Sequence, residues 1–368
     1  MKVALVHDDF MQSGGAENLF ATIAAIWPDA PIYTSIVDWS KLPESIGKSR
    51  IRPSFIQKLA IAKKWYKIFL PLFPLAFESF DFSKYDLVIS STTRFAKGII
   101  TKPKTVHICY INSLPRFLWS EETKREYLPV FLRILFTPLF NWLKKWDKIS
   151  STRVDLYIAN SQNVAKKVKE HYGIESEVIY PAVDTDFFTL PKSKRSNDFF
   201  LIVARLVKWK KVEIAIKAAI DLRINLKIVG TGADEARLKS IAKGQLLNVN
   251  YIEFLGNVSQ SHLKNLYQNT KALIITQEED FGIAAVEAQA CGIPVIAYKK
   301  GGQKEIIKEG KTGIFFNHQT GESLQDAIVA SSRVKWSDTA CRENALKFSQ
   351  AVFTRELKSK VTKYAKSS

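Results

Sequence analysis

Two glutamates eight positions apart, Glu279 and Glu287, stand in the segment of this sequence with the clearest pattern of a ligand site. Residues 276–294 read TQEEDFGIAAVEAQACGIP, in which an acidic loop follows an apolar strand and precedes a helix beginning near Gly282. Carboxylates just before a helix and in its second turn can accept hydrogen bonds from the hydroxyls of a hexose and of a ribose. The amides of Gly282 and Ile283 would lie at the helix N-terminus, which is a ready anion site.

A plainer interpretation of the same segment is that Glu278, Glu279 and Asp280 are solvated loop charges and that Glu287 is a surface residue of a helix. Three features that occur together favour the ligand site: the acidic loop, the helix start, and the exit through ACGIP at residues 290–294. Glycine is a good residue directly after a helix, so this exit marks the end of the helix.

Two cations form the second candidate group. Residues 199–211 read FFLIVARLVKWKK, an apolar strand followed by Arg205 and Lys210. Ligands of doubly wound sheets lie beyond the carboxyl ends of the strands, where both side chains would stand. Two cations on a diphosphate stabilise the negative charge that grows as a bond to its phosphate breaks. The alternative is a solvated basic turn, because Lys208 and Lys211 stand beside Lys210.

Glycines mark three further places. Gly14 and Gly15 follow the first apolar strand and open a helix, so that their backbone could approach an anionic ligand closely; an ordinary strand–helix turn has the same pattern. Gly230 begins a Gly-Thr-Gly sequence that could equally be a tight turn. The pair Gly301 and Gly302 is interpreted as structural.

Composition limits the class of protein. The chain has 368 residues, is 46% hydrophobic and 12% aromatic, and has a formal net charge of +18. At roughly 100–200 residues per domain two domains are expected, and this composition excludes disorder. The charge suits nucleic acid, a membrane surface or an anionic small substrate. The three cysteines lack disulfide or zinc spacing, which favours a reducing compartment. We recognise no signal peptide and no apolar stretch of the ~20 residues that span a membrane.

Apolar runs alternate with helix-length segments over most of the chain, which predicts parallel sheets covered on both faces. Residues 190–198 (LPKSKRSND) are polar and interrupt the alternation, so we expect an interdomain linker there. The predicted fold class is α/β, with two doubly wound Rossmann-like domains facing across a cleft. The predicted domains are residues 1–190, residues 191–348, and a C-terminal helix at 349–368 that packs back on the first domain. The predicted strands are residues 3–6, 32–36, 87–89, 106–111, 156–159, 178–180, 199–204, 226–229, 251–254, 272–275, 294–298 and 313–316.

The motifs and their order resemble the retaining, nucleotide-sugar-dependent glycosyltransferases of family 4, which have the GT-B fold. Glu279 and Glu287 resemble that family's E-x7-E motif, and Arg205 and Lys210 its Arg-x4-Lys. The resemblance is closest to the mannosyltransferase branch that builds O-antigen and capsule chains. Further similar segments are residues 13–17 (SGGAE), 180–187 (YPAVDTDF), 229–238 (VGTGADEARL) and 254–266 (FLGNVSQSHLKNL).

The resemblance implies a role for each candidate of the C-terminal domain, which would bind the nucleotide sugar. Arg205 and Lys210 would hold the diphosphate, Glu279 the donor hexose and Glu287 the ribose, with the Gly282 and Ile283 amides beside them. The Gly230 turn would lie near the nucleotide. In the N-terminal domain, which would bind the acceptor, Gly14 and Gly15 would face the donor diphosphate and sugar.

The implied reaction is retaining transfer of a hexose, with mannose expected, from a nucleoside-diphosphate sugar to a lipid-linked precursor of a cell-surface glycan. No cofactor is expected. Two alternatives remain open: a nucleotide-sugar epimerase on the same fold, and an inactive relative that only binds sugar nucleotide. We recognise no nucleic-acid-binding module, so nucleic acid is not an expected partner.

The sequence departs from the related branch at residues 110–119, which read YINSLPRFLW where a pattern close to Tyr-x-His-Thr-Pro-x-Arg-Tyr-x-Trp is usual. Asn112 therefore stands where the family has a histidine that contacts the donor sugar or its acceptor neighbourhood. Asparagine donates and accepts hydrogen bonds but cannot carry a proton. We expect Asn112 to alter sugar recognition without abolishing transfer.

No required metal is expected. Asp184-Thr185-Asp186 spells the D-x-D sequence that binds a divalent metal in other glycosyltransferases. Here it precedes the linker and matches the GT-B segment at that place, so it is assigned a structural role. The five histidines have no ligand spacing.

Two stretches combine basic and aromatic residues. Residues 50–67 (RIRPSFIQKLAIAKKWYK) carry six basic residues and no acid, and residues 127–148 end in WLKKWDK. Such stretches suit amphipathic helices in an anionic membrane interface. The alternative is helices packed in the first domain with solvated lysines. Because a lipid-linked acceptor would be found at that surface, we expect a cytoplasmic protein attached peripherally to the inner face of the cell membrane.

Overall fold

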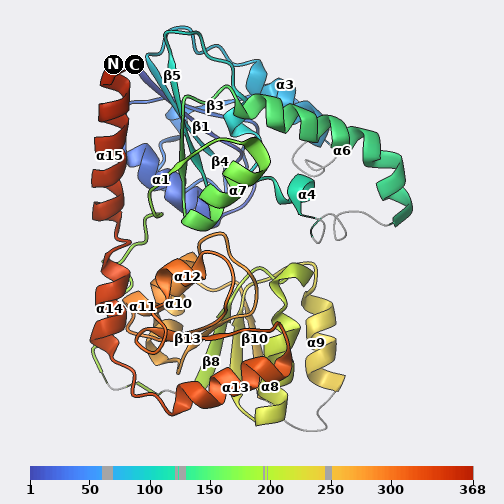
Figure 1. Cartoon of the computed structure of the whole chain (residues 1–368), viewed down its shortest axis with the longest axis vertical. Helices are drawn as coiled ribbons and strands as arrows, with labels where there is room; N and C mark the ends of the chain where they lie inside the picture. Colours follow the sequence, from blue (N-terminus) through green and yellow to red (C-terminus); the bar gives the residue numbers. More distant parts are fainter. Residues whose placement is uncertain are drawn as a thin grey trace. The chain divides into compact units, whose positions relative to one another are not determined.

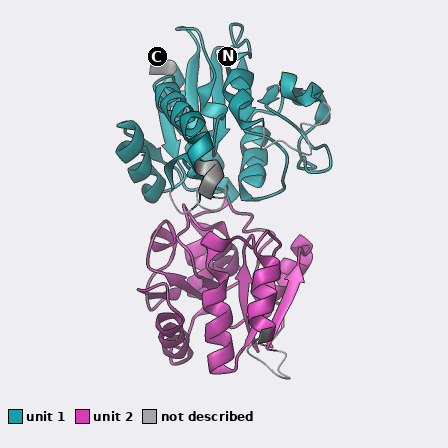
Figure 2. Cartoon of the chain, turned by 90° about the vertical axis from the view of Figure 1, so that its right-hand side faces the viewer, with its two compact units in different colours: residues 1–182, 350–368 teal, residues 183–349 magenta. Residues whose placement is uncertain are grey.

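The computed structural model describes residues 1–59, 69–120, 123, 130–193, 195–196, 198–244 and 251–367. These residues form two compact units (Figure 2): Met1–Ala182 with Gln350–Ser368, and Val183–Ser349. Each unit carries a parallel sheet with helices packed on it (Figure 1), so the predicted α/β fold of two Rossmann-like domains is confirmed.

The first unit is built on a parallel sheet. Its strands are β1 (Val3–His7), β2 (Ile32–Thr34), β3 (Ile51–Pro53), β4 (Leu87–Thr92), β5 (Val106–Ile111), β6 (Leu156–Ala159) and β7 (Glu177–Val178). Among the described residues they form seven strands in the order β3-β2-β1-β4-β5-β6-β7. The chain order reverses beside β1, which places the carboxyl ends of β1, β4 and β5 next to one another at the edge where ligands of such sheets bind.

Helices cover both faces of this sheet. They are α1 (Gly15–Ile26), α3 (Phe73–Glu78), α4 (Arg116–Trp119), α6 (Val130–Ser151), α7 (Gln162–Tyr172) and α15 (Gln350–Ser367), with short 3-10 turns η1 (Lys48–Arg50), η2 (Phe55–Lys58), η3 (Leu70–Leu72) and η4 (Ala96–Gly98). Neighbouring residues of β1 belong to different cores: Leu5 packs with Phe20 and Phe353, whereas Val6 packs with Phe77 and other residues of the opposite face. Because side chains alternate along a strand, two covered faces require an uninterrupted apolar run.

The C-terminal helix α15 packs in the core of the first unit, where Phe353, Leu357 and Val361 are buried. The boundary between the units lies at Ala182 and Val183, earlier than the 190/191 boundary expected from the linker composition. The reason is that the segment after Ala182 is bound to the second unit. Its backbone pairs through Val183 N with Phe348 O at 2.9 Å, and Phe188 packs edge-on against the Tyr267 ring.

Strand β3 was not predicted, and together with η2 it corrects the expected membrane-binding amphipathic helix over the described residues 50–59 of that stretch. Arg50 is not a free surface cation: its guanidinium donates to Ala30 O and Trp27 O, which closes the turn after α1. Residues 51–53 then form the edge strand, and Ile56 is buried. Residues 60–67 of that stretch, like residues 127–129 of the second, lie outside the described residues.

The second unit is built on another parallel sheet. Its strands are β8 (Phe199–Val203), β9 (Asn225–Val229), β10 (Ile252–Gly256), β11 (Leu273–Ile275), β12 (Val295–Tyr298) and β13 (Gly313–Phe316), in the order β10-β9-β8-β11-β12-β13. Its helices are η5 (Lys208–Lys210), α8 (Val212–Leu222), α9 (Glu235–Gly244), α10 (Gln260–Asn269), α11 (Ile283–Ala290), α12 (Gln303–Ile306), α13 (Gly321–Ser332) and α14 (Asp338–Leu346). The chain order reverses between β8 and β11, so the carboxyl ends of these two neighbours define the candidate ligand edge.

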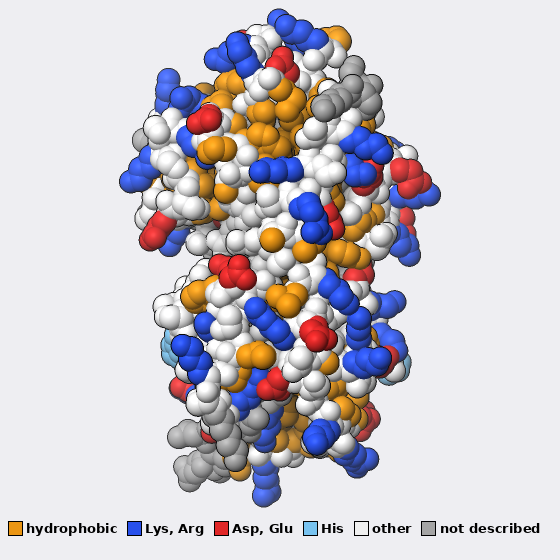
Figure 3. Space-filling model, turned by 90° about the vertical axis from the view of Figure 1, so that its left-hand side faces the viewer, with side chains coloured by type: hydrophobic (Ala, Val, Ile, Leu, Met, Phe, Trp, Pro, Cys, Tyr) orange, Lys and Arg blue, Asp and Glu red, His pale blue; other side chains and the backbone are white. Residues whose placement is uncertain are grey.

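The surface charge is dispersed on the face drawn in Figure 3, where Lys and Arg side chains are scattered and interspersed with Asp and Glu. On this face the described residues form no continuous basic stripe of the kind that tracks a phosphate backbone. In the described part of the chain no helix is both long enough and apolar enough to cross a membrane.

Candidate active site

Lys210 and Glu279 are in direct contact although 69 positions separate them in the chain. Lys210 Nζ donates a hydrogen bond to Glu279 Oε1 at 2.5 Å, and Gln277 Nε2 donates to the same oxygen. Lys210 ends the turn that follows β8, and Glu279 follows β11. Since β8 and β11 are neighbours, their carboxyl ends bring the basic turn and the acidic loop together. Lys210 and Glu279, one residue from each of the two groups singled out in the sequence, are therefore in one cluster.

The charge of Lys210 is compensated where it is buried. Its ammonium lies 4.4 Å from the centre of the Trp209 ring and against Glu279, and the residue is only 8% exposed. A buried ammonium is stable only when it is paired, and an aromatic face adds cation–π attraction. A fixed cation of this kind can stabilise a phosphate group without having to reorganise first.

Arg205 lies just after β8 with an exposed side chain, and the Gly230 turn holds its backbone in place. Leu206 N donates to Thr231 O at 2.9 Å. Gly230 has φ +125°, and a Cβ atom there would lie 1.9 Å from Ala204 O. Only glycine permits this approach, so the Gly230 turn positions the segment that carries Arg205.

Helix α11 begins at Ile283, directly after Gly282, which has a φ of +110°. Glu287 lies in its second turn and accepts a hydrogen bond from the hydroxyl of Tyr267 at 2.9 Å. Burial raises the pKa of Glu287 to about 7, and the hydrogen bond from Tyr267 opposes that shift. The structure thus brings Glu279, Gly282 and Ile283 together at one end of α11, with Glu287 one turn further along the helix.

Two polar residues beside this cluster were not singled out in the sequence. Tyr267 occupies a buried position of α10, and its hydroxyl is the partner of Glu287. Gln303 follows the glycine pair and accepts a hydrogen bond from Glu279 N at 3.0 Å. Both partners lie at least 20 positions away along the chain, so no local spacing marks either residue.

The first unit gathers the remaining candidates at the carboxyl ends of β1, β4 and β5. Asn112 follows β5, is 8% exposed, and donates through Nδ2 to Ser91 Oγ at 3.1 Å. Nδ1 of His7, the last residue of β1, lies 3.2 Å from Ser91 O. Gly14 and Gly15 open α1, as predicted. Asn112 therefore lies in a polar cluster at the ligand edge of the sheet.

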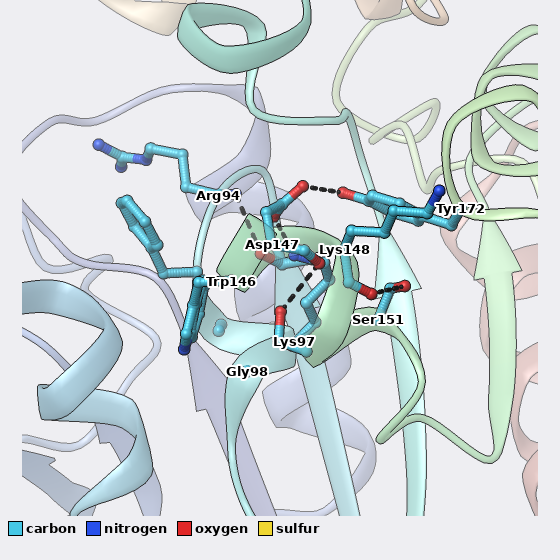
Figure 4. A network of polar contacts seen from close by, with 12 residues as sticks. Arg94, Lys97, Gly98, Trp146, Asp147, Lys148, Ser151 and Tyr172 are labelled. Carbon is cyan, nitrogen blue, oxygen red and sulfur yellow. Dashed lines mark hydrogen bonds and ion pairs between the residues drawn. The ribbon is translucent and has the colours of Figure 1, made fainter. Parts of the chain in front are cut away.

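A buried ion pair joins α6 to the turn that follows β4 (Figure 4). Lys97 Nζ is paired with Asp147 Oδ1, and neither side chain is exposed. The other carboxylate oxygen, Oδ2, accepts hydrogen bonds from Trp119 Nε1 and from the Tyr172 hydroxyl, both at 2.7 Å. Asp147 thus ties α4, α6 and α7 to the loop after β4, and Trp119 ends the segment that begins near Asn112.

No group of three or more His, Cys, Asp or Glu residues placed to hold a metal ion occurs in the described ranges. The Asp184-Thr185-Asp186 sequence makes a turn in the second unit: Asp184 Oδ1 accepts a hydrogen bond from Phe187 N at 2.9 Å. The three cysteines are buried free thiols.

Two family models match the chain one after the other. The model described as Glycosyltransferase Family 4 matches residues 13–187, and the model described as Glycosyl transferases group 1 matches residues 184–348. The chain belongs to the group 1 and family 4 glycosyltransferases. The prediction of a family 4 glycosyltransferase, and with it of an enzyme, is confirmed. No comparison gives support to the epimerase alternative.

Named relatives agree with this assignment. An uncharacterised glycosyltransferase of Methanocaldococcus jannaschii is 27% identical over 204 residues, covering 55% of this chain and 57% of that protein. The alpha-1,3/1,6-mannosyltransferase of Homo sapiens is 27% identical over 277 residues, covering 66% of this chain and 65% of that protein. The chain thus spans between about half and two thirds of the length of these curated relatives.

Two solved structures share the fold over the whole chain. Sucrose-phosphate synthase of Thermosynechococcus elongatus has a TM-score of 0.78 at 16% identity and covers 100% of both chains. HepE of Anabaena, solved in complex with UDP and glucose, has a TM-score of 0.73 at 18% identity and covers 98% of this chain and 99% of that one. These likenesses confirm the predicted GT-B fold.

Proposed function

We propose that the protein transfers a hexose from a nucleoside-diphosphate sugar to an acceptor hydroxyl with retention of configuration at the anomeric carbon. The observation that carries this proposal is the contact between Lys210 and Glu279 at the carboxyl edge of the second sheet, the edge where Arg205 follows β8 and α11 begins after β11. A cation for phosphate and a carboxylate for sugar hydroxyls are the two chemistries that a nucleotide sugar presents together.

Each residue has one task in this reaction. Arg205 and Lys210 stabilise the charge that grows on the leaving diphosphate, Glu279 binds the hexose, and Glu287 binds the ribose. The bond between the anomeric carbon and the phosphate oxygen breaks, the acceptor oxygen bonds to that carbon, and the acceptor proton passes to the leaving phosphate. Neither a metal nor a cofactor takes part. Gly14, Gly15 and the Gly230 turn allow the backbone to approach the donor closely. Asn112 contributes to sugar recognition.

Mannose is the hexose that we propose, with a lipid-linked precursor of a cell-surface glycan, of the O-antigen or capsule kind, as the acceptor. The resemblance of the motifs and their order to that mannosyltransferase branch supports this choice. The human relative named as a mannosyltransferase supports the sugar, whereas the HepE structure holds UDP and glucose.

We further propose peripheral attachment to the inner face of the cell membrane through α6. Five apolar side chains among the described residues of this helix are exposed, including Ile134 by 76%, Leu135 by 70% and Trp142 by 45%. The exposed residues Lys145 and Lys148 lie on the same helix. Apolar and aromatic residues beside lysines suit an anionic lipid interface, where a lipid-linked acceptor would also be found.

A panel of sugar nucleotides offered to the purified protein tests the reaction, with release of nucleoside diphosphate measured with and without a lipid-linked acceptor. Release that requires the acceptor supports transfer. Conversion of the donor sugar without any acceptor identifies an epimerase instead, and binding without turnover of any donor identifies an inactive relative.

Vesicle flotation tests the membrane proposal. We expect the protein to float with vesicles that contain anionic lipid, and the double variant Leu135→Ser, Trp142→Ser to stay behind at the same salt concentration. The control is Val329→Ser, which removes an exposed apolar side chain of the second unit. A wild-type protein that ignores anionic vesicles at low salt refutes the proposal.

A further inference from the structure

A buried glutamine joins the acidic loop to the end of β12. Gln303, the first residue of α12, has no exposed surface, and its side-chain amide makes three hydrogen bonds to the backbone. Oε1 accepts from Glu279 N at 3.0 Å, and Nε2 donates to Gln277 O and to Tyr298 O, each at 2.9 Å. One side chain therefore connects the loop that follows β11 to the neighbouring strand.

The glycine pair completes this support from the backbone side. Gly302 N donates to Glu279 O at 2.8 Å, so both the N–H and the C=O of Glu279 are held by residues that follow β12. A Cβ atom at Gly301 would lie 2.3 Å from Glu279 O, which explains why the chain has glycine there. With its backbone fixed on both sides, Glu279 can move its carboxylate only by side-chain rotation.

We infer that Gln303 is a positioning residue that sets the place of the Glu279 carboxylate and thereby determines which hexose the donor site accepts. This inference rests on the proposed function, in which Glu279 binds the donor hexose. Hexoses that differ at one carbon present the same hydroxyl in a different direction, so a carboxylate distinguishes them only when its place is fixed within a fraction of an ångström. Lys210 and Gln277 hold the carboxylate, and Gln303 holds the backbone that carries it.

Two substitutions separate the contacts of Gln303. Gln303→Met keeps the approximate size of the side chain and removes all three hydrogen bonds. Gln303→Glu keeps an oxygen that accepts from Glu279 N but loses the amide that donates to Gln277 O and Tyr298 O. The matched control is Thr270→Val, because the buried hydroxyl of Thr270 donates to Phe199 O and Ala272 O at the amino end of the same sheet.

Hydrogen exchange of residues 277–282 in the ligand-free protein tests the positioning itself, without any activity. We expect Gln303→Met to increase exchange in this segment, Gln303→Glu to increase it less, and Thr270→Val to leave it unchanged at a comparable loss of thermal stability. Unchanged exchange in Gln303→Met overturns the inference, whatever the protein catalyses. An equal increase in Thr270→Val also overturns it, because the effect would then be general destabilisation.

Calorimetry with UDP, UDP-glucose, GDP and GDP-mannose tests the specificity. In Gln303→Met the affinity for UDP and GDP should stay unchanged, whereas the preference among donor hexoses should fall on the order of 10- to 100-fold, with Gln303→Glu in between. If exchange rises in Gln303→Met but hexose preference matches wild type, Gln303 does not determine specificity. If no sugar nucleotide binds more tightly than its nucleotide even in wild type, Glu279 does not bind a hexose, and the proposed function fails while the exchange result stands.

Discussion

The hydroxyl of Tyr267 lies 2.9 Å from Glu287 Oε2, and this contact favours the ionised form of a carboxylate that burial keeps protonated, the carboxylate proposed for the ribose. Burial raises the pKa of Glu287 from its ordinary value of 4.5 to about 7, and the hydrogen bond from Tyr267 opposes that rise. Burial also raises the pKa of Tyr267 well above its ordinary value of 10, so the phenol keeps its proton and is the donor. The second unit therefore contains a carboxyl group that titrates near neutral pH.

This titration predicts a pH dependence of stability. Between pH 4.5 and pH 7 the folded protein keeps a proton on Glu287 that the unfolded chain has released, so its free energy of unfolding falls as pH rises. Glu287→Gln cannot lose a proton and should gain stability relative to wild type across that window, on the order of 3 kcal/mol in total. Denaturant unfolding of both proteins at several pH values measures the difference. Tyr267→Phe should move the upper limit of the window to higher pH, and an invariant difference between wild type and Glu287→Gln would contradict the assignment.

The contact of Lys210 with Glu279 predicts a large loss of rate when the cation is removed. Lys210→Ala should lower the rate of transfer by ~10²–10³, because the developing charge on the leaving phosphate loses a preorganised partner. Lys208→Ala is the matched control, since Lys208 is an exposed cation of the same turn and its replacement should change the rate by less than about twofold. Steady-state kinetics with the donor found in the panel measure both variants. Equal losses in the two variants would point to general electrostatic attraction by the basic turn.

Local patterns predicted much of the fold because both sheets are parallel and covered. Continuous apolar runs predicted β5, β6 and β13 with the bounds that the structure has. Strand β3 was not predicted from the sequence, because this three-residue edge strand contains Arg52 and Pro53 and therefore has no apolar run. The unit boundary was not predicted because residues 183–190 contact the second unit, through Val183 and Phe188 among others, and linker composition does not reveal such contacts.

Residues of the candidate site could be predicted from the sequence where they belong to short motifs that directly follow neighbouring strands. Arg205, Lys210 and Glu279 were singled out because each follows a recognisable strand, and Glu287 because it lies in the helix after the acidic loop. Gln303 was not, because its hydrogen bonds join backbone groups of two loops that are distant in sequence. A side-chain amide that hydrogen-bonds to distant backbone groups has no characteristic spacing from them in the sequence, so such a contact is seen only in the folded chain.

Two residues in left-handed conformation predict a gain in stability. Lys211 and Arg223 both have a φ of +53°, a region that disfavours residues with a Cβ atom. Lys211→Gly and Arg223→Gly should each stabilise the folded protein by about 1 kcal/mol, measured by denaturant unfolding. Arg223 ends α8 and serves as the control for Lys211, which directly follows Lys210. If Arg223→Gly gains stability and Lys211→Gly loses it, the left-handed lysine is held by contacts that outweigh its strain.

Asn112 is expected to act in sugar recognition. Its side-chain amide donates a hydrogen bond to Ser91 Oγ, which orients the side chain after β5. Asn112→Ala removes the donor and should change the relative turnover of different sugar nucleotides, while transfer itself continues. Asn112→His introduces a group that can carry a proton and should shift the preference again. Turnover of each donor by wild type and both variants is the measurement. If both variants match wild type with every donor, Asn112 lies outside the site.

Lys97 and Asp147 form a buried ion pair. Removing one of the two charges should destabilise the folded protein more than removing both. Lys97→Met leaves the Asp147 carboxylate without its cation in a fully buried place and should lower the free energy of unfolding by roughly 3–5 kcal/mol. The double variant Lys97→Met, Asp147→Asn has no buried charge, and the asparagine oxygen still accepts from Trp119 and Tyr172, so it should be more stable than Lys97→Met alone. Lys166→Met is the control, because its exposed pair with Glu170 at 3.7 Å should contribute less than ~1 kcal/mol. Denaturant unfolding compares these three variants with wild type, and a double variant no more stable than Lys97→Met would contradict the prediction.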